Sequence, residues 1–161
     1  MANYNLIFLK MTPGPKGKSE YTDNQGGFDL WVAPTDSVAN QGANIGGSVG
    51  TVIFTIKGGS DVHETFLGAT VGNSIKTTNV TYTNNLYFDN GRKNATKREY
   101  KEITFRGAEE VPQGGEFEGS VQLTFEYTYV KRSAISYKKN GQANPAVTTI
   151  LDLRKGKIQT Q

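Results

Sequence analysis

Residues 99–132 read EYKEITFRGAEEVPQGGEFEGSVQLTFEYTYVKR, two strand-like runs joined by a loop rich in Gly, Pro and Glu. In the second run, apolar and polar residues alternate over five repeats. The apolar positions are Val121, Leu123, Phe125, Tyr127 and Tyr129, and the polar positions are Gln122, Thr124, Glu126 and Thr128. This alternation predicts a long strand over residues 119–131 with one buried face and one face in water. The wet face carries no residue type typical of a reaction centre, so the stretch predicts a protein that builds a surface.

Length and composition favour one domain that folds by packing alone. The 161 residues fit a single domain, 1–161, with a core of its own. Cysteine is absent, which excludes disulfides, a thiolate nucleophile and cysteine metal sites. The formal net charge is +3, with basic and acidic residues interleaved over most of the chain. The densest basic cluster is Arg92, Lys93, Lys97, Arg98 and Lys101. We interpret it as a solvated hairpin turn, and we predict no nucleic-acid partner.

Alternating segments elsewhere, and the run 6–11 that is apolar on both faces, predict further strands. They lie at residues 6–11, 28–32, 52–56, 76–88, 100–106, 135–137 and 147–153. Asn90-Gly91 and Asn140-Gly141 are typical of hairpin turns between strands. Residues 12–27 and 35–50 are predicted to be loops, and residues 155–161 a frayed tail.

One short helix is predicted over residues 61–70. Asp61 is a suitable N-cap, and Glu64 follows three residues later, as in a capping box. Eight or nine strands suit a structure without exposed edges. We therefore predict an all-β fold with one short helix, an antiparallel β-barrel of two packed sheets. An open two-sheet sandwich is the alternative.

Candidate reaction centres in the sequence are weak. The segment 12–19, TPGPKGKS, approaches a phosphate-binding loop, but Thr12 stands where glycine is needed and two prolines remove backbone N–H groups. His63 is the single histidine, and no serine lies in a nucleophile-elbow pattern. Glu109-Glu110 and Glu116/Glu118 are interpreted as solvated charge or as half of an intersubunit salt bridge. We predict no enzyme activity and no catalytic, cofactor-binding or metal-binding residues.

Aromatic residues offer a ligand-binding alternative. Tyrosines can stack on bases or sugars. However, Tyr82, Tyr127, Tyr129 and Tyr137 fall on the apolar phase of their strands, and we predict that they pack in the core. The N-terminus has no charged segment before its short apolar run, which predicts no secretory signal peptide. No apolar run reaches the length of a membrane span, so we predict no membrane insertion.

The order of these features resembles the Hcp (haemolysin-coregulated protein) family, the inner-tube proteins of type VI secretion systems. The matching fragments are Phe8-Leu9-Lys10, Lys16-Gly17-Lys18-Ser19, Trp31 in the second strand, Phe54 to Lys57, the helix at 61–70, and the paired strands 100–111 and 120–127. Tube proteins of contractile phage tails are structural relatives of this family. The chain departs from common members in its second strand, FDLWVAP, and in the longer, more basic segment 89–98.

The resemblance implies a non-catalytic subunit that forms six-membered rings stacked head to tail. Its implied partners are further copies of itself, the spike protein and sheath of the secretion machine, and effector cargo. It further implies a protein that stays in the bacterial cytoplasm until it is secreted through the type VI system without a signal peptide. Other contractile tubes, a monomeric ligand-binding β-module and a nucleic-acid-binding barrel remain as alternatives.

Two surfaces are predicted to serve assembly. The long segment 35–50 is expected to contact a neighbouring subunit through Asn40, Gly42, Asn44, Ile45 and Ser48. The polar face of Gln122, Thr124, Glu126 and Thr128 is expected to face the lumen of the tube. A polar, weakly charged lining would let cargo pass without sticking.

Overall fold

The computed structural model describes residues 4–12, 16–19, 21–38, 49–58, 62–66, 79–88, 91–111, 116, 119–140, 142–153 and 157–160. Eleven strands are described. They are β1 (Tyr4–Thr12), β2 (Phe28–Asp29), β3 (Thr35–Val38), β4 (Gly50–Ile56), β5 (Asn79–Phe88), β6 (Gly91–Lys101), β7 (Thr104–Glu110), β8 (Val121–Tyr127), β9 (Tyr129–Ala134), β10 (Val147–Asp152) and β11 (Lys157–Thr160). A 3₁₀ turn lies at Thr22–Asn24, and residues 62–66 form a short α-helix.

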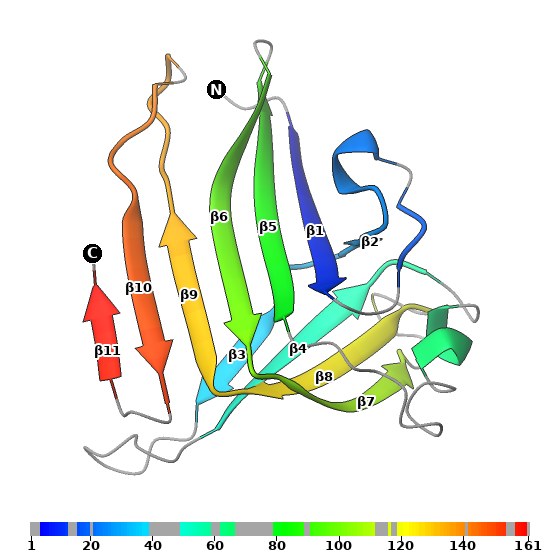
Figure 1. Cartoon of the computed structure of the whole chain (residues 1–161). Helices are drawn as coiled ribbons and strands as arrows, with labels where there is room; N and C mark the ends of the chain where they lie inside the picture. Colours follow the sequence, from blue (N-terminus) through cyan, green and yellow to red (C-terminus); the bar gives the residue numbers. More distant parts are fainter. Residues whose placement is uncertain are drawn as a thin grey trace.

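The strands form two antiparallel sheets (Figure 1). The seven-stranded sheet has the order β11-β10-β9-β6-β5-β1-β2, and the four-stranded sheet has the order β3-β4-β8-β7. The four-stranded sheet crosses behind the lower half of the larger sheet, and the short helix lies beside the end of β7 (Figure 1). This confirms an all-β fold with one short helix and two packed sheets. Beside β2 the two sheets are joined at the isolated bridge Leu30↔Ile56, where the Trp31 N–H donates a 3.1 Å bond to the Thr55 carbonyl and the Lys57 N–H a 2.8 Å bond to the Asp29 carbonyl. The described strands otherwise pair within two separate sheets, so the predicted closure into one barrel was wrong.

Residues 99–132 cross from one sheet to the other twice. β6 ends at Lys101 in the larger sheet, and β7 begins at Thr104 in the smaller one. The chain returns by the same step between β8 and β9, with a bend at Thr128. Glu102 has φ +54°, and the Thr128 hydroxyl donates a 2.6 Å hydrogen bond to its carboxylate. The predicted single strand over 119–131 is therefore two strands, β8 and β9, which are joined by the bend at Thr128. This bend lies next to the corner at Glu102, between β6 and β7.

The bend also shifts the phase of the buried residues. Tyr127 is buried, whereas the next buried residue is Val130 and not Tyr129. Tyr129 and Tyr137 are half-buried, so the prediction that they belong to the core was wrong, while Tyr82 and Tyr127 are buried as predicted. The alternation alone could not reveal the shift, because each side of the bend keeps a period of two.

The core lies between the two sheets and is rich in aromatic rings. Phe54 of β4 is fully buried and lies 5.8 Å from Tyr100 and 6.0 Å from Phe125, measured between ring centroids. Tyr100 of β6 in turn lies 5.0 Å from Tyr127 of β8. Residues from both sheets thus interlock, which is the arrangement that holds a two-sheet fold together.

Several segments differ from their predictions because pairing between distant strands overrides local pattern. The basic residues 92–101 are part of β6, which pairs with β5 on one side and β9 on the other, and do not form a turn. Residues 35–38 form β3 against β4, and the tail forms β11 against β10. Residues 135–137 contribute only the isolated bridge Tyr137↔Ala143. The predicted cap Asp61 lies outside the described residues.

Candidate functional site

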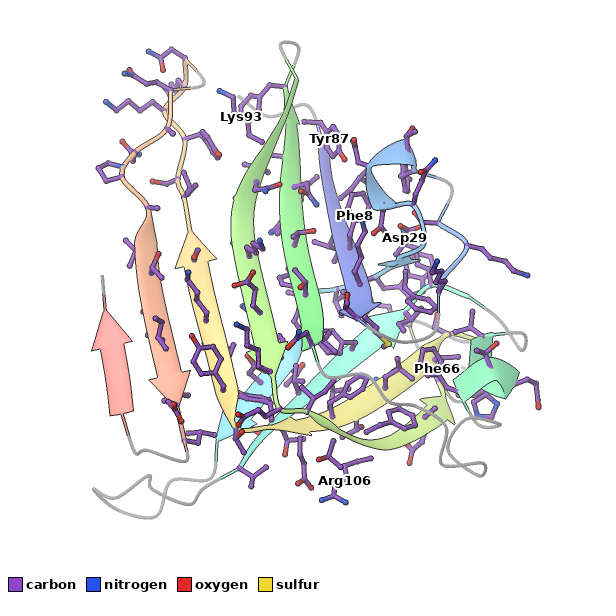
Figure 2. All side chains as sticks on the ribbon, in the orientation of Figure 1. Phe8, Asp29, Phe66, Tyr87, Lys93 and Arg106 are labelled. Carbon is purple, nitrogen blue, oxygen red and sulfur yellow. The ribbon has the colours of Figure 1, made fainter. Side chains whose placement is uncertain are left out.

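The outward face of β8 carries the residues that we predicted to face a lumen. Buried and solvent-accessible side chains alternate along the strand, with Gln122 exposed and Thr124 and Glu126 half-buried. Arg106 of β7 donates bonds of 2.7 Å and 3.1 Å to the two carboxylate oxygens of Glu126. Figure 2 shows Arg106 on the lower, outward side of this sheet. Thr128 lies at the bend between the sheets and does not extend the face of β8.

The predicted interface residues Asn40, Gly42, Asn44, Ile45 and Ser48 lie outside the described residues. β3 ends at Val38 and β4 begins at Gly50, so the two paired strands flank this segment. Its role in assembly stays a prediction.

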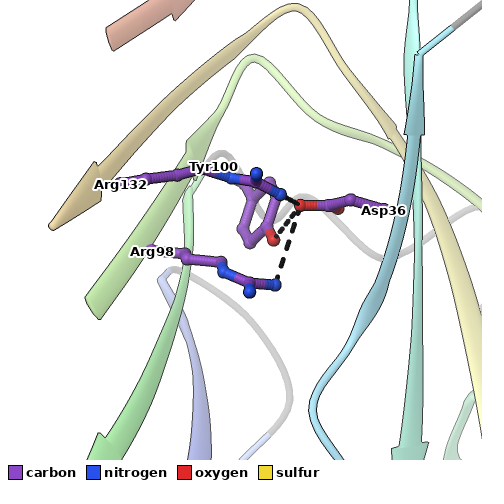
Figure 3. A network of polar contacts seen from close by, with 4 residues as sticks. All are labelled: Asp36, Arg98, Tyr100 and Arg132. Atoms are coloured by element: carbon purple, nitrogen blue, oxygen red, sulfur yellow. Dashed lines mark hydrogen bonds and ion pairs between the residues drawn. The ribbon is translucent and has the colours of Figure 1, made fainter. Parts of the chain in front are cut away.

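A buried polar network joins the two sheets near this segment (Figure 3). Asp36 of β3 has a side chain 9% exposed, and its Oδ2 accepts a 2.8 Å hydrogen bond from the Tyr100 hydroxyl. The same oxygen accepts a bond from the Arg132 guanidinium and lies 3.8 Å from Nη1 of Arg98. Arg98 and Arg132 are cross-strand partners on β6 and β9. One carboxylate of the smaller sheet therefore faces two neighbouring cations of the larger sheet.

The Asp36 network was not predicted from the sequence. Residues 35–50 have the composition of a loop, so Asp36 had no expected strand, and Arg98 was assigned to a solvated turn. The sequence feature that corresponds to β3 is the four-residue run Thr35–Val38. A run of this length is too short to distinguish a strand from a loop by its periodicity. The network orders the edge strand β3, and its described residues converge on one another and not on an open substrate position.

Burial of the tyrosines near Asp36 predicts alkaline unfolding. Burial, with the Asp36 carboxylate adding, raises the pKa of Tyr127 from 10.0 to about 12. The same causes raise the pKa of Tyr100, and burial raises that of Tyr82. Above pH 10 the unfolded chain loses these protons while the folded chain keeps them. Stability is therefore retained below pH 10 and falls as the pH rises toward 12, with Tyr127 contributing at most about 1.4 kcal/mol per pH unit.

Urea unfolding at successive pH values between 8 and 12 would measure this fall. This range includes the ordinary pKa of Tyr127, 10.0, and its raised pKa, about 12. Tyr127→Phe should show a shallower fall than the unchanged protein. A free energy of unfolding that stays level through this range would contradict the burial argument.

His63 and the acidic residues do not assemble a catalytic centre in the described part of the chain. His63 Nδ1 lies 3.4 Å from the Glu110 carboxylate, at the end of β7. Phe66, from the same helix, packs 5.5 Å from Phe28 and 6.0 Å from Phe105, which fixes the helix on the core. No group of three or more His, Asp or Glu residues that could hold a metal ion occurs among the described residues. The residues that the structure describes include no helix that is long and apolar enough to span a bilayer.

A shallow groove of about 190 Å³ runs beside β1 and β2. Tyr21 and Trp31 line it, and they are 40% and 46% exposed. Lys57 lies over the Trp31 ring, with Nζ 4.6 Å from the centroid, and the indole N–H donates a 2.6 Å bond to Ser120. The lysine thus covers an aromatic face on which a sugar or a base would otherwise stack.

Solved structures of Hcp proteins share this fold. Hcp1 from Salmonella typhimurium matches with a TM-score of 0.69 and 12% identity, over 99% of this chain and 100% of its own. A structure described as a type six secretion system protein gives the same TM-score and identity, over 97% and 100%. Hcp2 from Salmonella typhimurium gives 0.62 and 14%, over 94% and 98%. No family model and no curated protein matches the sequence. The chain therefore has the Hcp fold over nearly its whole length, which confirms the resemblance.

Proposed function

We propose that this chain, which has the Hcp fold, is a structural subunit of a type VI secretion tube. The observation that carries the proposal is the match to Hcp1 over 99% of this chain. The protein's own surfaces support it independently. The face of β8 is polar, and the charges of Arg106 and Glu126 on it neutralise each other. A structural, non-catalytic role also agrees with the surroundings of His63, where the described residues do not assemble a catalytic centre.

In this role the subunits form six-membered rings that stack into a tube and deliver effectors. A ring of this kind needs two different contact surfaces on each subunit. We propose residues 40–48 as part of one contact, and Gln122, Thr124 and Glu126 as lumen-facing. The further partners are the spike and the sheath, and export occurs through the tube itself. A tube of another contractile injection system would use the same geometry.

The first experiment is the native mass of the purified protein by light scattering, with negative-stain images of the same peak. We expect a mass of about six times 17.6 kDa and closed rings with a central hole. A monomer at high concentration would contradict the proposal. It would favour a ligand-binding β-module.

A further inference from the structure

Two hairpin tips at one end of the larger sheet are joined into a basic surface. Phe88 of β5 packs edge-on against Tyr137, with ring centroids 5.7 Å apart, and the Tyr137 hydroxyl donates a 2.8 Å bond to the Asn94 carbonyl. Nζ of Lys93 lies 5.3 Å and 5.4 Å from the two ring centroids. Lys138 and Lys139 are exposed on the adjoining turn, which the Lys138 N–H closes onto the Gln142 carbonyl at 2.9 Å. We call Lys93, Lys138, Lys139 and this aromatic pair the basic platform.

The charge of these two hairpins is strongly one-sided. Residues 87–94 and 136–143 contain four cations, Arg92, Lys93, Lys138 and Lys139, against the single anion Asp89, a net charge of +3. The aromatic pair and the hydrogen bond hold the two tips together, so the cations do not lie on independent loops. A fixed cluster of like charges favours an acidic partner surface.

The hairpin between β7 and β8 has the opposite character. Residues 109–118 read EEVPQGGEFE, with four glutamates and no cation, a net charge of −4. Glu109, Glu110 and Glu116 are exposed. The Val111 N–H donates a 2.8 Å bond to the Ser120 carbonyl and closes the base of the hairpin. Residues 112–115, 117 and 118 lie outside the described residues, so we call the exposed Glu109, Glu110 and Glu116 the acidic hairpin.

The two surfaces cannot meet within one chain. Lys93 is at the top of the larger sheet in Figure 2, whereas β7 ends at the lower right beside the short helix in Figure 1. A second copy of the chain is therefore the partner that supplies each surface with its complement. Such a contact uses two different surfaces, so it can propagate from copy to copy.

We infer that the acidic hairpin of one copy binds the basic platform of the next copy, and that this contact fixes the head-to-tail order of the assembly. The inference rests on the proposed self-assembly and adds its residues and its chemistry. The contact is electrostatic, so it weakens as the screening length falls from about 8 Å at physiological salt to about 3 Å at 1 M salt.

Paired charge reversals test the contact. The first variant, with Lys138→Glu and Lys139→Glu, has an acidic platform beside its unchanged acidic hairpin. The second variant, with Glu109→Lys and Glu116→Lys, carries cations on its hairpin as well as on its unchanged platform. We expect each variant to lose assembly by light scattering while keeping its circular dichroism spectrum. We expect an equimolar mixture of the two to regain binding between unlike chains, because the unchanged platform of one variant then meets the unchanged hairpin of the other. Glu110 is left unchanged because it pairs with His63.

The control is Lys10→Glu with Lys16→Glu, which changes the net charge equally at two exposed positions away from the platform. We expect this variant to assemble as the unchanged chain does. Assembly that persists in both reversed variants and in 1 M salt would overturn the inference and leave the tube proposal standing. A mixture in which the two variants do not bind each other would overturn the inference as well. An unchanged chain that stays monomeric at every salt concentration would overturn both proposals.

Discussion

Asp36→Ala is expected to lower the free energy of unfolding by about 3 kcal/mol. The substitution removes the carboxylate that accepts bonds from Tyr100 and Arg132 and faces Arg98. Two neighbouring guanidinium groups then repel each other, and the buried Tyr100 hydroxyl loses its acceptor. Breaking a buried ion pair from one side costs about 3–5 kcal/mol. We place the effect at the lower end because the Arg132 side chain is 42% exposed and keeps part of its hydration.

Urea unfolding monitored by tyrosine fluorescence would measure this loss. Glu126→Ala is the matched control, because Glu126 also forms an ion pair with an arginine, but Arg106 is 54% exposed. Exposed pairs contribute about 0–1 kcal/mol, so the control should change stability little. Equal losses in the two variants would mean that burial does not set the strength of the Asp36 network.

Phe54→Ala is expected to lower the free energy of unfolding by about 4 kcal/mol, because truncating a packed phenylalanine to alanine costs about 3–5 kcal/mol. Phe54 is fully buried between the sheets and contacts Tyr100 of one sheet and Phe125 of the other. The cavity would therefore open at the junction of the sheets. A loss of this size is a large part of the roughly 5–15 kcal/mol that stabilises a typical domain.

Thermal unfolding followed by circular dichroism would show the loss as a lower Tm. Val147→Ala provides the comparison, because Val147 is 57% exposed and leaves no cavity. A Phe54→Ala protein as stable as the Val147→Ala protein would mean that the two sheets do not share one core.

Strands with a long alternation could be predicted from the sequence, whereas strands that depend on their neighbours could not. The prediction of a strand at 147–153 was confirmed by β10, and β8 lies within the predicted strand 119–131, although that prediction missed the bend. β3 and β11 have four residues each, and only their partners β4 and β10 make them strands. The bend at Thr128 was hidden because threonine is an ordinary strand residue.

The candidate surfaces divide in the same way. The wet face of β8 follows from a period of two, so Gln122, Thr124 and Glu126 could be placed on one side from the sequence. The Asp36 network joins residues 36, 98 and 132, which lie on three strands of two sheets. No local pattern relates these positions, and only the fold brings them together.

The paired crossings at Glu102 and Thr128 have a mechanical consequence. Two covalent connections run side by side from one sheet to the other, and a hydrogen bond ties them at the corner. A force that slides one sheet over the other must strain these peptide chains as well as displace the side chains packed between the layers. The corner therefore resists shear between the two sheets, and shear stiffness of this kind suits the tube subunit that we propose.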